Sequence, residues 1–211
     1  MNLYNRPFLL LLILIALFSI NKAHADSVQS CDLASITEQL NDQPTLNRFT
    51  QTKHISILSK PLTSQGFLLI SEPNNGVVWQ TLAPIRSTIV ISDKELRQFN
   101  KLDEPVTAPA SSNQKASQLI SSTFLAILAG NLSQLEENFR SQIECSSQQW
   151  HIVLQANNSD MQHLIDSIII QGQSSIEHLT FTEANGDRTE LTFTAVDNAD
   201  TAQQLGQYFV P

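Results

Sequence analysis

The chain is poor in the residues and motifs from which enzymes are usually recognised. Its 211 residues include six glycines, with no glycine-rich phosphate loop, no G-x-S-x-G nucleophile elbow and no H-E-x-x-H zinc motif. Four histidines follow residue 25, and their spacing is not typical of a metal site: His54, His151, His163 and His178. His163 and Asp166 lie close in sequence and serines are plentiful, so composition leaves a Ser/His/Asp arrangement open, without a positive signal for it. We therefore expect no enzymatic activity, no cofactor and no metal.

Positive charge is also scarce. The chain has 12 Lys and Arg against 20 Asp and Glu, a net charge of −8, and no basic run. Nucleic acids and anionic membrane surfaces attract proteins through Lys and Arg, which neutralise phosphates. This composition disfavours both as partners and excludes nucleic acid from the functions that we expect.

Only the N-terminus carries a long apolar run. The run 7–20 follows the single basic residue Arg6 and precedes the small-residue pattern Ala23-His24-Ala25. It is shorter than the roughly 20 residues that a membrane-spanning helix needs, so a retained anchor is the less favoured alternative. We expect residues 1–25 to be a cleaved signal peptide and 26–211 to be one exported domain. Asp26 follows the cleavage site, so a new N-terminus would offer no cysteine for lipid attachment.

The two cysteines, Cys31 and Cys145, both follow the predicted signal peptide. In an oxidising compartment, an isolated pair of cysteines is most simply one disulfide. Metal binding is a poor alternative because neither residue belongs to a C-x-x-C motif. The bridge would close a loop of more than 100 residues.

Turn residues divide the chain into short strands and two helices. A helix is expected over 34–40, with Asp32 as its N-cap, and another over 116–129, where apolar residues recur at helical spacing before Gly130. Residues 100–116 read as a polar loop. The strands form two sets without intervening helices, which is typical of antiparallel meanders. They are expected at 46–56, 62–70, 76–81, 87–92 and 96–99, and then at 139–145, 150–156, 165–172, 176–183 and 188–196.

Three of these strands are apolar on both faces: 67–70, 89–91 and 168–170. Such strands must be covered on each side. The expected fold class is therefore α+β, mainly antiparallel, with a curved sheet around a helix. That arrangement places a core on one side and leaves room for an apolar cavity.

A family resemblance lies between residues 49 and 93. The residues that carry it are Phe49-x-Gln51, the stretch Leu58-x-Lys60-Pro61-Leu62-x-Ser64-x-Gly66, Pro73, Trp79 with Pro84 after it, and Ile91-x-Asp93. In order and spacing they resemble the periplasmic outer-membrane lipoprotein carrier (LolA-like) family. The resemblance implies an incomplete half β-barrel with a helical lid, whose apolar concavity shelters acyl chains.

The resemblance also implies partners and a location. These are a lipid-bearing cargo, an inner-membrane donor protein and an outer-membrane acceptor protein, with the carrier a monomer in the periplasm of a Gram-negative bacterium. Two positions depart from the family pattern: Glu72 stands where carriers commonly have arginine, and Val77 where they have an aromatic residue. We interpret the chain as a divergent branch whose cargo is a lipoprotein or another envelope lipid, glycolipids included. The alternative is a module on the same fold that senses lipid or protein.

The strand patterns and the helix together define a predicted lipid-binding set. We expect these residues to line or cap one concave cavity, although an ordinary core would explain each of them singly. The set is Phe67, Leu69, Val77, Trp79, Ile89, Ile91, Phe124 and Ile127.

Overall fold

The structure is a computed structural model that describes residues 31–43, 45–92, 96–106, 114–146 and 149–210. The predicted signal peptide, residues 1–25, lies outside the described residues and stays a prediction. Within the described ranges, none of the helices has the length and apolar character needed to cross a membrane.

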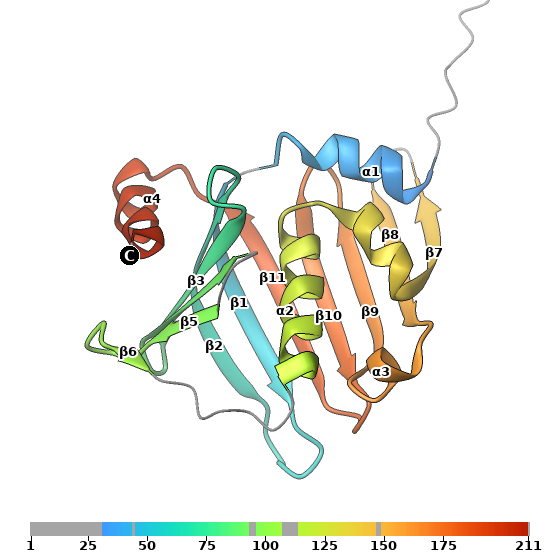
Figure 1. Cartoon of the computed structure of the whole chain (residues 1–211), viewed down its shortest axis with the longest axis horizontal. Coiled ribbons are helices and arrows are strands. Elements are labelled where there is room, and N and C mark those ends of the chain that lie inside the picture. Colours follow the sequence, from blue (N-terminus) through green and yellow to red (C-terminus); the bar gives the residue numbers. More distant parts are fainter. Residues whose placement is uncertain (1–30, 44, 93–95, 107–113, 147–148, 211) are drawn as a thin grey trace, which may run out of the picture.

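An open antiparallel sheet of eleven strands forms the body of the molecule (Figure 1). Two meanders meet where β1 pairs with β11, and β6 and β7 are the two edges. The fold is therefore the expected α+β half-barrel. The strands are β1 (Leu46–His54), β2 (Leu62–Ser71), β3 (Gly76–Ala83), β4 (Ser87–Ser92), β5 (Leu96–Phe99), β6 (Pro105–Val106), β7 (Phe139–Cys145), β8 (Trp150–Ala156), β9 (Ile165–Gly172), β10 (Ile176–Glu183) and β11 (Arg188–Ala195).

Helix α2 (Gln114–Leu128) lies across one face of the sheet, which we call the concave face (Figure 1). It belongs to the connection that leads from one edge strand, β6, to the other, β7. The helix ends at Leu128 and is followed by Gly130, whose φ of 77° is accessible to glycine at little cost. The expected helix is confirmed, and the short 3-10 helix η1 (Leu132–Glu137) continues the chain towards β7.

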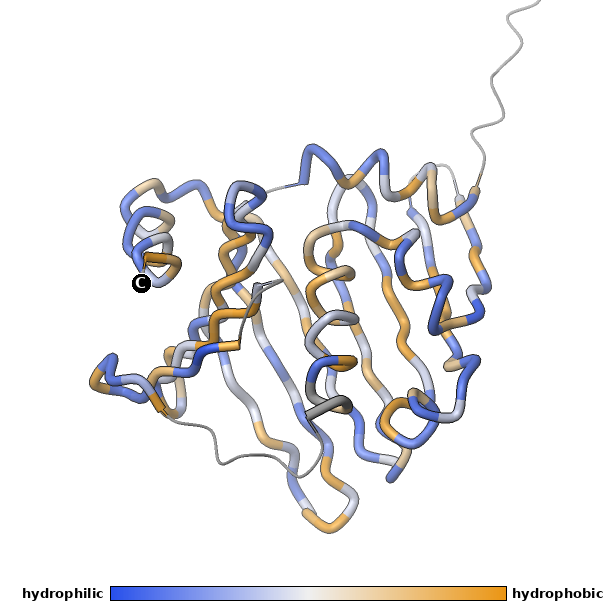
Figure 2. Tube along the Cα trace, viewed as in Figure 1, coloured by the Kyte–Doolittle hydropathy of each residue, from blue (hydrophilic) through white to orange (hydrophobic). Residues whose placement is uncertain are grey.

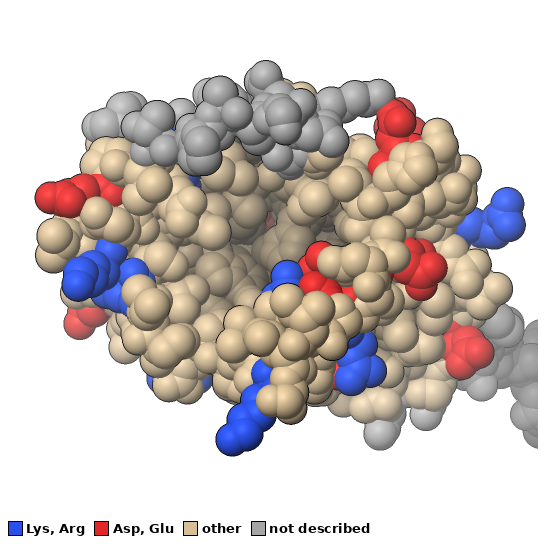
Figure 3. Space-filling view, turned by 90° about the horizontal axis from the view of Figure 1, so that it is seen from below, with Lys and Arg blue, Asp and Glu red and all other residues tan. Residues whose placement is uncertain are grey.

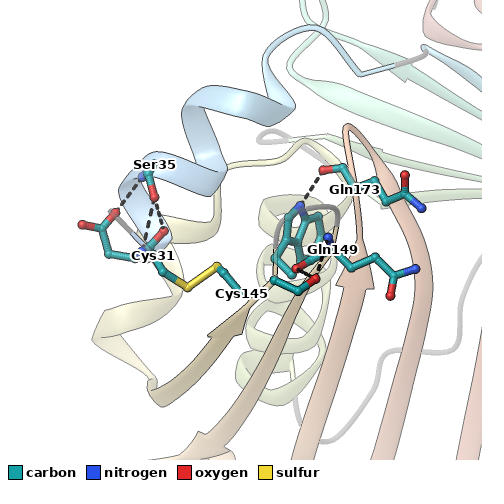
Figure 4. Close-up of a disulfide and its surroundings, with 8 residues drawn as sticks. Cys31, Ser35, Cys145, Gln149 and Gln173 are labelled. Atoms are coloured by element: carbon teal, nitrogen blue, oxygen red, sulfur yellow. Dashed lines mark hydrogen bonds between the residues drawn. A yellow bond between two sulfur atoms is a disulfide. The ribbon is translucent and has the colours of Figure 1, made fainter. Parts of the chain in front are cut away.

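Helix α1 (Leu33–Leu40) begins at the expected N-cap. The Asp32 carboxylate accepts a hydrogen bond from the Ser35 backbone N–H at 2.8 Å. The preceding residue, Cys31, is bonded to Cys145 at the end of β7, with 6.0 Å between their Cα atoms (Figure 4). The predicted disulfide is confirmed, and it ties α1 to an edge strand.

The C-terminal helix α4 (Ala199–Gly206) and the 3-10 helix η2 (Gln207–Phe209) were not predicted from the sequence. Together they cover the other face of the sheet, the convex face, where Leu205 and Tyr208 pack with Leu69 and Val78. The overlooked signal is Asn198, whose side chain caps α4 by accepting from the Thr201 N–H. Helix α3 (Ser159–Gln162) and strand β6 were also missed; β6 lies within the predicted loop 100–116.

Candidate functional site

Five aromatic rings fill the middle of the half-barrel beneath α2. The Trp79 ring centroid lies 4.0 Å from that of Phe49 and 6.3 Å from that of Phe193. From α2, Phe124 contacts Trp79 edge-on at 5.9 Å and stacks on Phe181 at 4.9 Å. Rings at these separations attract one another beyond the area that they bury. The centre of the concave face is therefore a packed core.

A cavity of about 460 Å³ lies beside this core, between α2 and strands β1, β9, β10 and β11. Figure 3 views the molecule from the end where the β1–β2 connection projects, and it shows a hollow there that is bordered mostly by uncharged residues. The apolar wall of the cavity consists of Ile120, Phe124, Leu164, Ile165, Phe181, Ala184 and Leu191. Its polar lining residues include Gln51, His163, Glu183, Asn185 and Thr189.

Paired charges lie around the cavity. Lys53 donates to the carboxylate of Glu183, a lining residue, at 2.8 Å. Nearby, Asp187 accepts a hydrogen bond from the Ser56 backbone N–H at 2.9 Å, and chiefly this bond lowers the pKa of the Asp187 carboxyl. Among the described residues, no group of three His, Cys, Asp or Glu side chains is placed to hold a metal ion. The site therefore combines an apolar wall, whose chemistry suits an apolar chain, with polar lining residues.

The structure brings together six of the eight residues in the predicted lipid-binding set. They lie on the concave face, either in its buried core or packed against it, and they are Val77, Trp79, Ile89, Ile91, Phe124 and Ile127. Only Phe124 lines the cavity itself. Whether any of the six binds lipid stays a prediction.

The other two residues of the set, Phe67 and Leu69, lie on the convex face with α4, so the expectation of one shared cavity is wrong for them. Their neighbours Leu68 and Ile70 point to the concave core instead. Side chains alternate between the two faces of a strand, so an error about one residue's face exchanges the concave-face and convex-face residues of the whole strand. An unbroken apolar run offers no alternation from which the face could be chosen.

Several cavity residues were not recognised from the sequence, although signals for them existed. Ile120 precedes Phe124 by one helical turn and therefore shares its face of α2. Phe181 and Leu191 occupy inward positions of strands β10 and β11, which alternate between apolar and polar residues. These patterns identify an inward face, but they do not distinguish a cavity wall from a filled core.

The model of one protein family, the outer membrane lipoprotein carrier protein LolA, matches residues 45–208. The matched region runs from just before β1 into η2, so it contains the whole sheet, α2 and α4. No curated protein matches the chain.

Solved structures similar to this chain have low sequence identity to it. A LolA superfamily protein from Nitrosomonas europaea is 10% identical, with a TM-score of 0.40, over 82% of this chain and 97% of its own. A domain described as an outer membrane lipoprotein-sorting protein, from Vibrio parahaemolyticus, is 10% identical, with a TM-score of 0.39, over 82% of this chain and 96% of its own. A DUF1329 family protein from Desulfovibrio piger is 9% identical, with a TM-score of 0.39, over 80% of this chain and 92% of its own.

The family match agrees with the residues that carried the resemblance, since Phe49, Lys60, Trp79 and Pro84 all lie inside the matched region. It also agrees with the open half-barrel and its covering helix. At the level of the family, this supports a carrier-like role in lipoprotein sorting. The chain belongs to the outer membrane lipoprotein carrier protein LolA family, as a divergent member.

Proposed function

We propose that the protein is a periplasmic carrier that shelters the acyl chains of a lipoprotein or another envelope lipid, glycolipids included, during transfer toward the outer membrane. The observation that carries the proposal is the cavity of about 460 Å³ with an apolar wall beneath α2. Its volume falls within the range of about 300 to 1,000 Å³ that is usual for small-molecule sites. The family match supports a lipid-bearing cargo.

Burial of an acyl chain supplies the driving force. Each methylene group removed from water contributes about 0.8 kcal/mol, so ten of them contribute on the order of 8 kcal/mol. An acyl chain therefore needs an apolar shelter in order to cross an aqueous compartment. The wall formed by Phe181, Leu191 and Ile165 offers one, and Ile120 and Phe124 of α2 close it from the opposite side.

The closed arrangement around α2 implies that the helix moves when cargo enters. Phe124 stacks on Phe181 and contacts Trp79, so the central rings occupy the space next to the cavity. Displacement of α2 would separate Phe124 from both rings and extend the cavity along the concave face. Val77, Trp79, Ile89, Ile91 and Ile127 would then join Phe124 in contacting lipid.

The proposal is tested by the lipid content of the protein. We expect mass spectrometry of protein purified from the periplasm to detect an acyl-bearing lipid, and the loaded protein to deliver it to acceptor vesicles. Retention of lipid without delivery would indicate a sensing module instead. A purified protein without lipid that also fails, after delipidation, to bind a fluorescent acyl probe would contradict the proposal.

Glu72 is expected to affect partner choice more than stability. It is exposed in the β2–β3 turn, where its carbonyl oxygen accepts from the Asn75 N–H. The substitution Glu72→Arg should change the free energy of unfolding by no more than about 0.5 kcal/mol, as is usual at the surface. We expect it to change lipid uptake from a donor protein or lipid delivery to an acceptor protein, while thermal unfolding stays the same. A collapse of the melting temperature would instead show that Glu72 is a structural residue.

A further inference from the structure

The hairpin formed by β1 and β2 has an unusual charge composition for this chain. No Asp or Glu occurs from residue 43 to residue 71, although the whole chain contains 20. The same stretch contains Arg48, Lys53 and Lys60. The positive charges of this segment are not all at its tip, because Arg48 lies over Phe67 farther along the hairpin and Lys53 is paired with Glu183. Lys60, between β1 and β2, is the cation that the tip itself offers to an anionic surface.

The tip of this hairpin is apolar and exposed. Ile57 is 88% exposed, Leu58 45% and Leu62 53%. Figure 2 shows this apolar tip projecting at one end of the molecule, and Figure 1 places it at the end of β1 and β2. Ile85, in the β3–β4 connection at the same end of the sheet, is also exposed. Isolated exposed apolar residues are common, but several in one projecting tip indicate an interaction surface.

The structure holds this tip in place. The Leu58 N–H donates to the Ile55 carbonyl at 2.9 Å, which forms a turn with Ile57 inside it. The Ser56 N–H donates to the Asp187 carboxylate at 2.9 Å, which fixes the turn to the β10–β11 connection. The exposure of Ile57 therefore results from an ordered conformation.

The hairpin also lies at the cavity. Lys53, near the end of β1, forms its ion pair with Glu183, which lines the cavity. Gln51, on the same strand, lines the cavity as well. Whatever binds the hairpin tip is therefore next to the site proposed for the acyl chain.

We propose that the hairpin tip 55–62 is a membrane-contact site for a bilayer that contains anionic lipids. Ile57 and Leu58 enter the boundary between headgroups and acyl chains, and Lys60 lies at the level of the lipid phosphates. Contact of this kind turns the cavity toward the bilayer, so that an acyl chain passes between them without crossing bulk water. The inference goes beyond the proposed function, because membrane contact through the tip requires no cargo in the cavity.

Co-sedimentation with vesicles tests this site. The wild-type protein should bind vesicles of phosphatidylethanolamine and phosphatidylglycerol, and binding should weaken with added salt. The double variant I57S/L58S should reduce binding about tenfold or more, because two apolar side chains no longer enter the bilayer. Lys60→Gln should reduce it about fivefold and leave binding to phosphatidylcholine vesicles unchanged.

The matched control is Val210→Ser, which alters an apolar side chain near the C-terminus that is 68% exposed and is not part of the hairpin. It should bind vesicles like the wild type. The altered hairpin residues are exposed, so all variants should unfold at the wild-type temperature. Equal vesicle binding by I57S/L58S and Val210→Ser would overturn the proposal. So would the absence of wild-type binding to anionic vesicles, which would leave a protein partner for the tip.

Membrane contact through the tip and acyl-chain binding in the cavity can be tested separately. I57S/L58S should bind a fluorescent acyl probe as well as the wild type does, since neither residue lines the cavity. A protein that binds vesicles through the tip but no acyl probe would support membrane contact and contradict the carrier function.

Discussion

Removal of the Cys31–Cys145 disulfide is expected to lower the free energy of unfolding by about 4 to 5 kcal/mol. The two cysteines are 114 residues apart in sequence, so the bridge restricts a large part of the unfolded chain. In the chain-entropy model, a longer closed loop gives greater stabilisation. For a domain of this size, at about 2 to 4 °C per kcal/mol, the loss corresponds to a decrease in melting temperature of about 8 to 20 °C.

The measurement is thermal unfolding of the wild type, with and without reductant, and of the double variant C31S/C145S. The reduced wild type and the double variant should unfold at the same lowered temperature. Reductant should have no effect on the double variant, which serves as the control. The folded structure should change little, because Leu33, Ile36 and Leu40 still bury α1 against the core. An unchanged melting temperature on reduction would show that the bridge contributes no stability.

Replacing Ile120 by glutamate is expected to weaken binding of a fluorescent acyl probe about 100-fold, or by about 3 kcal/mol. Ile120 lies on α2 and forms part of the cavity wall with Phe124 and Leu191. A bound acyl chain would either bury the new carboxylate without a partner or leave some of its own methylene groups in water. Folding should be affected far less, because Ile120 is 40% exposed and glutamate is a good helix former.

Gln118→Glu is the matched control, since it adds the same charge to an exposed position of the same helix that is not part of the cavity lining. When the delipidated proteins are titrated with the probe, Gln118→Glu should bind it with wild-type affinity and Ile120→Glu should bind it about 100-fold more weakly. Equal affinities for both variants would place the acyl chain elsewhere. Ile89 is a poorer position for this test: it pairs with Trp79 across β3 and β4 and packs against the concave core, so a charge there would also affect folding.

Local sequence was sufficient to predict most of the secondary structure. Strands β4, β5, β7, β8, β9 and β10 have the expected bounds, because the connections between strands are rich in proline, glycine, asparagine, aspartate and serine, which favour turns. Asp32 likewise predicted the start of α1, since a capping side chain bonds a backbone N–H only a few residues away. These signals work because the interacting residues are neighbours in the chain.

Local sequence was not sufficient where burial depends on contacts between residues far apart in the chain. Helix α4 is short and mostly polar, and it becomes a cover for the convex face only because Leu205 meets Leu69 and Val78 of β2 and β3. The face on which Phe67 lies was undecided for a related reason, since both faces of β2 are buried, one by α2 and the other by α4.

The sequence alone therefore determined the order of ten of the strands and of helices α1 and α2, the disulfide pair and the family resemblance. Only the tertiary structure decided which apolar residues form the core and which border a cavity. Both kinds of residue are apolar and face inward, so their local patterns are identical. The difference arises where Phe49, Trp79, Phe124 and Phe181, from four separate elements, fill the centre and leave the space beside them open. Packing between residues far apart in sequence sets that boundary, and no periodicity within one segment encodes it.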